Sequence, residues 1–411
     1  MKINFKILKT VEFSFLVIVS IYSLISAYFF LTRNAGSGDE MLFMNDLDFI
    51  KTEGWNNAVR KNISIPYMLL VYPLSLFLKN FIVLRLVNVL IVSSLFFYFF
   101  KRIKKQLPFY GFLLFFISTV GYFYFGTNDS LFFVALIIFL CEVFFLIGKG
   151  EWNATLALSA LTIAFFAREL ILVYTPVILI CFYIIYHKKG FSNLKWYYPL
   201  GLVALFLVLN LPSLTENGNL SYDLKSPPQS AKSNWVQRQY LAQLMVNKGE
   251  LPNHNHPSWE QTDAYLKANG ENSLPKGIIS GVLFDIKLTV KEFFKDFFEC
   301  TFFGFRQLGF ILLLTFFFGA RGFIRERKIN ESTFIPLILM MMLSIFSFII
   351  ISFVELRWLA PVFIASILYY WNLQHKKSIN KNMVIINYAI LILMSLYGSF
   401  NLCNKIISNC G

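Results

Sequence analysis

Long runs of apolar residues alternate with short polar turns along almost the whole chain. A stretch of about 18 or more apolar residues can cross a hydrocarbon core about 30 Å thick. The pattern therefore predicts an all-α fold, a polytopic bundle of about 11 transmembrane helices. The expected spans are 11–32, 85–101, 108–126, 131–148, 154–168, 170–187, 196–213, 301–320, 333–353, 358–373 and 382–400.

One further apolar segment, "SIPYMLLVYPLSLFLKNFIVL" (64–84), is not counted as a span. It contains two prolines and Lys79, and it follows Arg60 and Lys61. If it crossed the membrane, the basic run "KRIKK" (101–105) and the later basic loops would change sides, against the usual charge bias. We expect it to form a helix that lies in the outer interface.

The charges place this bundle in a membrane. The chain is 57% hydrophobic and only 15% charged, which excludes an ordinary soluble domain. Its net charge of +14 gathers in short loops such as 101–105, 321–328 and 375–381, with almost no acidic residues beside it. That is the pattern of cytoplasmic loops, so the expected partner is the lipid bilayer and not nucleic acid. The charge pattern predicts a cytoplasmic N-terminus. Enrichment in Lys, Asn, Ile and Phe is typical of an A+T-rich bacterial gene, so we expect the membrane to be a bacterial inner (plasma) membrane.

Three regions follow from this topology. Residues 1–213 form a transmembrane core whose first outer loop, 33–84, carries interfacial helices. Residues 214–300 form a large periplasmic loop with one short helix around "WVQRQYLAQLMV". In its last part Ile286, Val290 and the phenylalanines at 293, 294, 297 and 298 recur at helical spacing, opposite three lysines and Asp296, which predicts an amphipathic helix on the membrane surface. Residues 301–411 hold the C-terminal spans.

Charged residues at the edge of the hydrocarbon need a reason, because each costs about 2.5–3.5 kcal/mol at the centre of a span. Three groups fall on the expected outer face. They are Asp39 and Glu40 in "GSGDE", Asp129 in "GTNDS", and Arg168 and Glu169 in "FFAREL" together with Glu355 and Arg357 in "FVELRWLAP". Each has a plainer interpretation as a solvated flank, a turn residue or an interface anchor. Their common depth favours a polar cavity that opens outward.

No metal site is predicted. The "HNH" at 254–256 has its histidines two residues apart in a proline-rich loop without a third ligand nearby, and the five cysteines show no ligand spacing.

The order of these motifs resembles the GT-C superfamily of integral-membrane glycosyltransferases. The resemblance covers residues 1–210 and 330–375 and rests on "GDE", "IPYMLLVYPLSLFLKNFIVLRLVNVL", "GTNDSLFFVALIIF", "FFARELILVYTPVIL" and "VELRWLAPVF". It implies that Asp39 is the catalytic base, with Glu40 as the fallback, and that Asp129 supports it. It also implies that Arg60 or Lys61 contacts the donor phosphate, although the "KPP" form of that element is absent.

The resemblance further implies a polyprenyl-phosphate-linked sugar donor and a glycan or lipid-linked acceptor on the periplasmic face. Arg168, Arg357 or Lys61 then meets the phosphate as its bond to the sugar breaks. A divalent metal stays open as a cofactor, since no ligand set specifies one. The size of the chain is similar to that of serotype-converting glucosyltransferases that act on O-antigen.

Other classes of membrane protein remain open. A flippase-type transporter would carry charges at mid-membrane and repeated halves, whereas these charges lie at the rim. A polysaccharide polymerase or ligase would use paired arginines in its outer loops, and the large loop offers Arg238 without an obvious partner. A structural scaffold would leave Arg168 and Glu169 unexplained.

Overall fold

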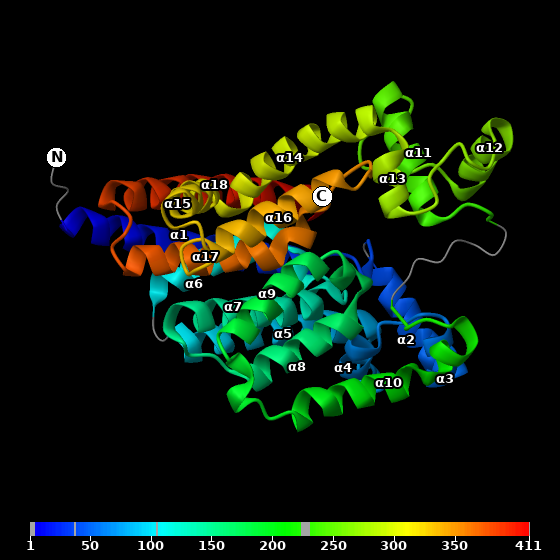
Figure 1. The fold of residues 1–411 in the computed structure, drawn as a ribbon, viewed down its shortest axis with the longest axis horizontal. Coiled ribbons are helices and arrows are strands. Elements are labelled where there is room, and N and C mark those ends of the chain that lie inside the picture. Colours follow the sequence, from blue (N-terminus) through cyan, green and yellow to red (C-terminus); the bar gives the residue numbers. More distant parts are fainter. Residues whose placement is uncertain (1–4, 37, 104–105, 223–230, 411) are drawn as a thin grey trace. The chain divides into compact units, whose positions relative to one another are not determined.

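The computed structural model describes residues 5–36, 38–103, 106–222 and 231–410, and within these ranges every regular element is a helix (Figure 1). The chain divides into two compact units. Unit 1 comprises Met1–Leu224, Phe305–Leu339 and Ala360–Gly411, and unit 2 comprises Lys225–Gly304 and Met340–Leu359. Two helices, α14 (Ile286–Leu308) and α16 (Phe334–Phe348), begin in one unit and end in the other.

Unit 1 is a bundle of apolar helices. They are α1 (Phe5–Leu31), α2 (Glu40–Glu53), α3 (Trp55–Arg60), α4 (Ile65–Ser75), α5 (Asn80–Ile103), α6 (Leu107–Val120), α7 (Asp129–Lys149), α8 (Ala154–Ala167), α9 (Thr175–His187), α10 (Tyr197–Asn217), α15 (Phe310–Glu326), α17 (Ala360–His375) and α18 (Lys381–Cys410). α1 packs along α18 and α6, α7 packs against α8, α17 and α5, and α10 packs against α8 and α3 (Figure 1).

Glycines and aromatic rings bring the N- and C-terminal helices together. A Cβ atom at Gly398 of α18 would lie 2.7 Å from the ring of Tyr22 on α1, and one at Gly111 of α6 would lie 2.6 Å from the ring of Phe15. The Phe15 ring lies 5.0 Å from that of Tyr388. Small residues that allow such close approach are common at helix–helix interfaces in membranes. There the burial of apolar surface contributes little to helix association, because lipid tails are as apolar as the side chains.

The expectation of eleven spans is wrong. Five described helices are long and apolar enough to cross a membrane (α1, α5, α7, α10 and α18), and the bent pair α14 and α15 would make a sixth if it forms one span. Each of the other expected segments contains a helix, but these helices are short. α6, for example, has 14 residues, which is about 21 Å against about 30 Å of hydrocarbon. The helices nevertheless fit a helical membrane protein.

Helix breaks explain the shortening. α6 ends at Gly121, whose φ of 69° is the left-handed conformation that favours glycine. α8 ends where Arg168 adopts an extended backbone. The expected span 301–320 is divided at Gly309, where α14 and α15 meet at a bend of 117°. The expected span 333–353 stops as a helix at Phe348. Hydropathy does not register these breaks.

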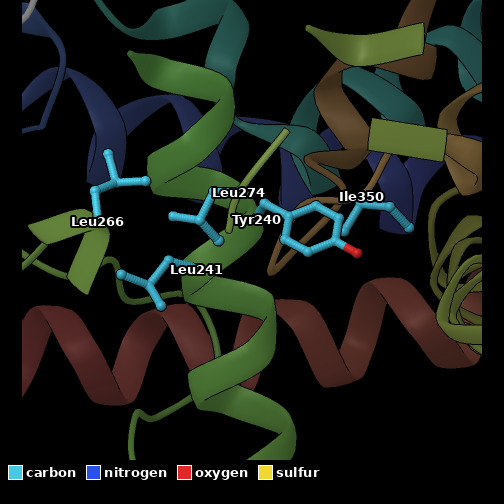
Figure 2. Close-up of a cluster of buried hydrophobic side chains, with 5 residues drawn as sticks. All are labelled: Tyr240, Leu241, Leu266, Leu274 and Ile350. Atoms are coloured by element: carbon cyan, nitrogen blue, oxygen red, sulfur yellow. The ribbon is translucent and has the colours of Figure 1, made fainter. Parts of the chain in front are cut away.

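Unit 2 has a small hydrophobic core of its own. It is made by α11 (Trp235–Lys248), α12 (Trp259–Asn269), the loop that leads from α12 to α13 (Ile278–Phe284) and the segment after α16. Figure 2 shows Tyr240 and Leu241 of α11 with Leu266, Leu274 and Ile350, all of them buried. The sequence predicted α11 but missed α12 and α13. The missed signal for α12 is a capping box, in which the Ser258 side chain accepts from the Gln261 N–H.

Candidate functional site

Glu40 is buried at the start of α2, although the sequence places it in a polar loop. The loop turns back on itself at Gly36 and Gly38, whose φ angles are 76° and 62°. The Gly36 N–H donates a 2.9 Å hydrogen bond to Oε2 of Glu40. The turn therefore directs this carboxylate into unit 1 and away from solvent.

Arg85, near the start of α5, neutralises Glu40. Its Nε donates to Oε1 and its Nη2 donates to Oε2 of Glu40, both at 2.7 Å, and the two side chains are 6% and 0% exposed. The guanidinium also donates to the carbonyls of Leu31, Arg33 and Asn34 at 2.8–3.1 Å. A buried charge pair whose hydrogen bonds are this well satisfied fixes the chain that follows α1.

This arrangement separates the roles of the two adjacent carboxylates. Glu40 has both oxygens engaged by Arg85, so it cannot take a proton from a substrate without breaking the pair. Asp39, at the N-cap position of α2, is only half-buried. Of the two, Asp39 is the one that a substrate at the surface of unit 1 can reach.

Arg85 went unnoticed in the sequence because it lies in the apolar run "NFIVLRLVNVL". A signal was present: an arginine inside an apolar helix needs an acidic partner or a water-filled cavity. Asn88, one turn further along α5, is also completely buried. Its side-chain amide donates to the carbonyls of Phe125 and Thr127, in the turn that precedes α7.

The "GTND" turn touches the Glu40 carboxylate directly. A Cβ atom at Gly126 would lie 2.9 Å from Oε1 of Glu40 and 2.5 Å from Cβ of Leu84. Only glycine fits here without displacing its neighbours. The turn at 126–129 therefore packs against Glu40 beside α5, and Asp129 follows three residues after this contact. Glu40 and Asp129, with their ion-pair partners, are here called the polar cluster.

Asp129 forms an ion pair with Arg168. Asp129 lies in the first turn of α7, where the helix dipole favours a negative charge. Its side chain is 2% exposed, whereas that of Arg168 is 25% exposed. The Ala167 carbonyl, at the end of α8, accepts hydrogen bonds from Asn128 (3.2 Å) and Ser64 (2.8 Å). The heads of α4 and α7 are thus tied to the end of α8.

Glu169 is directed elsewhere. It is exposed at the start of a short 3₁₀ helix (Glu169–Leu172) that links α8 to α9. The pKa of Tyr222 is raised to about 12, mainly because the side chain is buried and to a smaller extent because of the negative charge of Glu169. Glu169 therefore lies near the segment that follows α10.

Arg60 and Lys61 lie where α3 ends. Arg60 Nε forms a 2.8 Å ion pair with Glu216, and both side chains are exposed. Lys61 Nζ lies 3.8 Å from the centroid of the Phe49 ring and is also exposed. Ser221 donates to the carbonyl of Ile63 at 2.7 Å, which joins this corner to the segment near Glu169.

An apolar groove of about 420 Å³ leads away from the polar cluster. Its walls are Leu70 and Leu74 of α4, Val87, Leu90, Ile91 and Ser94 of α5, Leu131, Val134, Ala135 and Ile138 of α7, and Leu156, Ser159, Ala160 and Ile163 of α8. Val87 follows Arg85 by two residues and Leu131 follows Asp129 by two. Along the axes of α5 and α7 the groove therefore begins within one turn of Arg85 and Asp129, and two serines are its only polar wall residues.

Glu355 and Arg357 belong to unit 2 and form an ion pair with each other. On a helix, residues two apart would face away from each other. The segment before the 3₁₀ helix Leu356–Leu359 is not helical, which allows the pair to form. The Arg357 side chain is 6% exposed and that of Glu355 is 33% exposed.

Within the described residues, no group of three or more His, Cys, Asp or Glu side chains is placed to hold a metal ion. No protein-family model matches the chain, and no curated protein or solved structure is significantly similar to it.

Proposed function

We propose that this protein is a glycosyltransferase of the GT-C kind, which transfers a sugar from a polyprenyl-phosphate donor to a glycan or lipid-linked acceptor. In this proposal the protein lies in a bacterial inner membrane, with its N-terminus in the cytoplasm and its polar cluster facing the periplasm. O-antigen is the acceptor that the size of the chain favours.

One observation carries the proposal: a cluster of acidic and basic side chains lies within one helical turn of an apolar groove along α5 and α7. The ion pairs Glu40–Arg85 and Asp129–Arg168 lie at the starts of α2, α5 and α7 and at the end of α8. The groove of about 420 Å³ runs along α4, α5, α7 and α8 from that point. A polyprenyl-phosphate donor likewise combines a charged phosphate head, which would suit the charged cluster, with a long hydrocarbon tail, which would suit the apolar groove.

In the proposed reaction the acceptor hydroxyl oxygen attacks the anomeric carbon of the donor sugar. Asp39 takes the hydroxyl proton as the new bond forms. The bond between the anomeric carbon and the phosphate oxygen breaks, and its electron pair leaves with polyprenyl phosphate. A single direct displacement inverts the configuration at the anomeric carbon.

Positive charge must meet the phosphate as it departs. Arg85 is unsuited to this task because Glu40 and three carbonyls occupy its guanidinium. Arg168 fits better, since it is tied to Asp129 yet remains 25% exposed. Lys61, exposed and just ahead of the proline-containing α4, is the second cation assigned to the phosphate.

The proposal is tested by the sugar composition of surface glycan from cells that carry the gene, cells that lack it, and lacking cells complemented with it. We expect one sugar to be lost on deletion and restored on complementation. Identical glycan from all three strains would contradict the proposed function.

A further inference from the structure

In the first part of α14, acidic side chains are buried and large apolar side chains are exposed, which is the reverse of a helix at the surface of a water-soluble domain. Two of its acidic residues, Glu292 and Asp296, are buried at 1% and 5% exposure. Five large apolar side chains on the other face are exposed at steps of four residues: Ile286, Val290, Phe294, Phe298 and Phe302. The sequence had placed Asp296 with the lysines on the solvent face, so the structure corrects that assignment.

The buried Glu292 is held by contacts inside unit 2. The Asn247 amide of α11 donates a 2.7 Å hydrogen bond to Oε1 of Glu292. Lys295 lies 3.3 Å from Oε2 of the same carboxylate. These contacts fix the rotation of α14, so its apolar stripe faces outward because the polar face is engaged.

The apolar surface extends onto the preceding helix, α13. Ile278, Ile279, Leu283 and Phe284 are exposed, with Ile279 at 80%. Together with the stripe on α14 they place nine exposed large apolar side chains within residues 278–302. A patch of this kind is a binding surface and not ordinary surface composition.

The charges beside the stripe are positive. Lys287 and Lys291 are exposed, and each follows a stripe residue directly, Ile286 and Val290. With Glu292 and Asp296 turned inward and Glu299 half-buried, this side of α14 presents basic and apolar groups together. An apolar stripe flanked by lysines is the surface that binds the interface of an anionic bilayer, where the lysine stems extend along the stripe to reach the headgroups.

We propose that α13 and α14 up to Phe302 form a docking surface for an anionic phospholipid bilayer. Continuity along the chain selects lipid over a partner protein, because α14 leads through the 117° bend at Gly309 straight into the apolar α15. A helix that turns this sharply before an apolar helix is suited to lie along the membrane surface. The inference does not depend on the proposed glycosyltransferase activity.

The test uses the full chain in lipid nanodiscs, with Cys403 and Cys410 replaced by serine. Bimane is attached at Phe298→Cys, and in a second sample at Ala264→Cys, an exposed position on α12 of the same unit. We expect doxyl-labelled lipid to quench the label at 298 strongly and the label at 264 weakly, with iodide in water giving the reverse order. Equal quenching of both labels by each reagent would overturn the docking surface.

Lipid composition tests the charge assignment. Quenching at position 298 should be stronger in nanodiscs that contain phosphatidylglycerol than in phosphatidylcholine alone. Each lysine near an anionic surface favours docking by about fivefold, so the double variant Lys287→Gln, Lys291→Gln should lose most of this preference. If wild-type quenching does not change with phosphatidylglycerol, the anionic assignment is wrong. Sugar transfer is not measured here, so either result leaves the proposed function to its own test.

Discussion

At the scale of single residues, two neighbouring carboxylates have opposite environments. Glu40 is fully buried and bound at both oxygens by Arg85, whereas Asp39 stays half-exposed at the head of α2. The sequence could only rank them as a first choice and a fallback for the base. The ion pair with Arg85 gives Glu40 a structural role, which is to hold the turn before α2 in place.

The Glu40–Arg85 pair predicts a large effect on stability. Arg85→Gln leaves a buried carboxylate without its partner, so we expect the free energy of unfolding to fall by about 3–5 kcal/mol. Arg60→Gln removes an exposed pair with Glu216, which should cost at most about 1 kcal/mol. Denaturant unfolding in the same detergent compares the two variants. Equal losses would show that the buried pair is not a structural anchor.

Residue identity alone did not reveal the pairings. Asp129 and Arg168 were both recognised as charged residues at the edge of the membrane, yet the ion pair that joins them links positions 39 apart in the sequence. Arg85 was missed because its helix reads as a uniform apolar run. Partners that come from different helices are set by packing, and a single sequence carries no record of which side chains meet.

At the scale of elements, the turn before α7 packs against both α5 and the start of α2. Gly126 is the point of closest approach, because a Cβ atom there would meet Cβ of Leu84 at 2.5 Å and Oε1 of Glu40 at 2.9 Å. The Leu84 atom next to the backbone cannot move aside easily. The two polar turns can therefore pack this closely because residue 126 has no side chain.

Gly126→Ala should consequently destabilise the protein by about 1–3 kcal/mol, the usual cost of overpacking. Gly201→Ala, in α10, is the matched control, since a Cβ atom there meets nothing within 4 Å. That change should be neutral or slightly stabilising, because alanine is the better helix former. Thermal unfolding of both variants measures the difference, and an unaffected Gly126→Ala would contradict the close contact.

Helix existence was predictable from the apolar runs, and helix ends were not. α1, α5, α7, α10 and α18 occur where the pattern placed them. The runs near 301–320 and 333–353 are interrupted by Gly309 and by the non-helical segment after Phe348. Hydropathy averages over a window, so it cannot register a single residue that ends a helix.

At the scale of the whole molecule, long helices pack beside short ones in unit 1. Five or six of the described helices can span a bilayer by length, and the short helices α4 and α8 form walls of the apolar groove. Helices too short to cross the whole membrane are suited to forming the walls of a groove. The groove is the feature that no sequence pattern predicted.

Filling the groove tests the proposal that it holds the donor's lipid tail. Ser94 is an exposed wall residue and Ser93 is an exposed neighbour outside the groove. Ser94→Trp should raise KM for the lipid donor by about tenfold, which corresponds to burying roughly two fewer methylene groups. Ser93→Trp should leave KM near its wild-type value. Equal KM values in the two variants would exclude the groove from donor binding.

The catalytic role proposed for Asp39 is tested by the effect of Asp39→Asn on sugar transfer in membranes that contain the protein. Loss of a general base lowers the rate by about 10²–10⁴-fold, so we predict a loss of that size with unchanged membrane insertion. Glu53→Gln, an exposed carboxylate at the end of the same helix, should leave transfer unchanged. Transfer by Asp39→Asn at the wild-type rate would contradict the proposal that Asp39 is the general base.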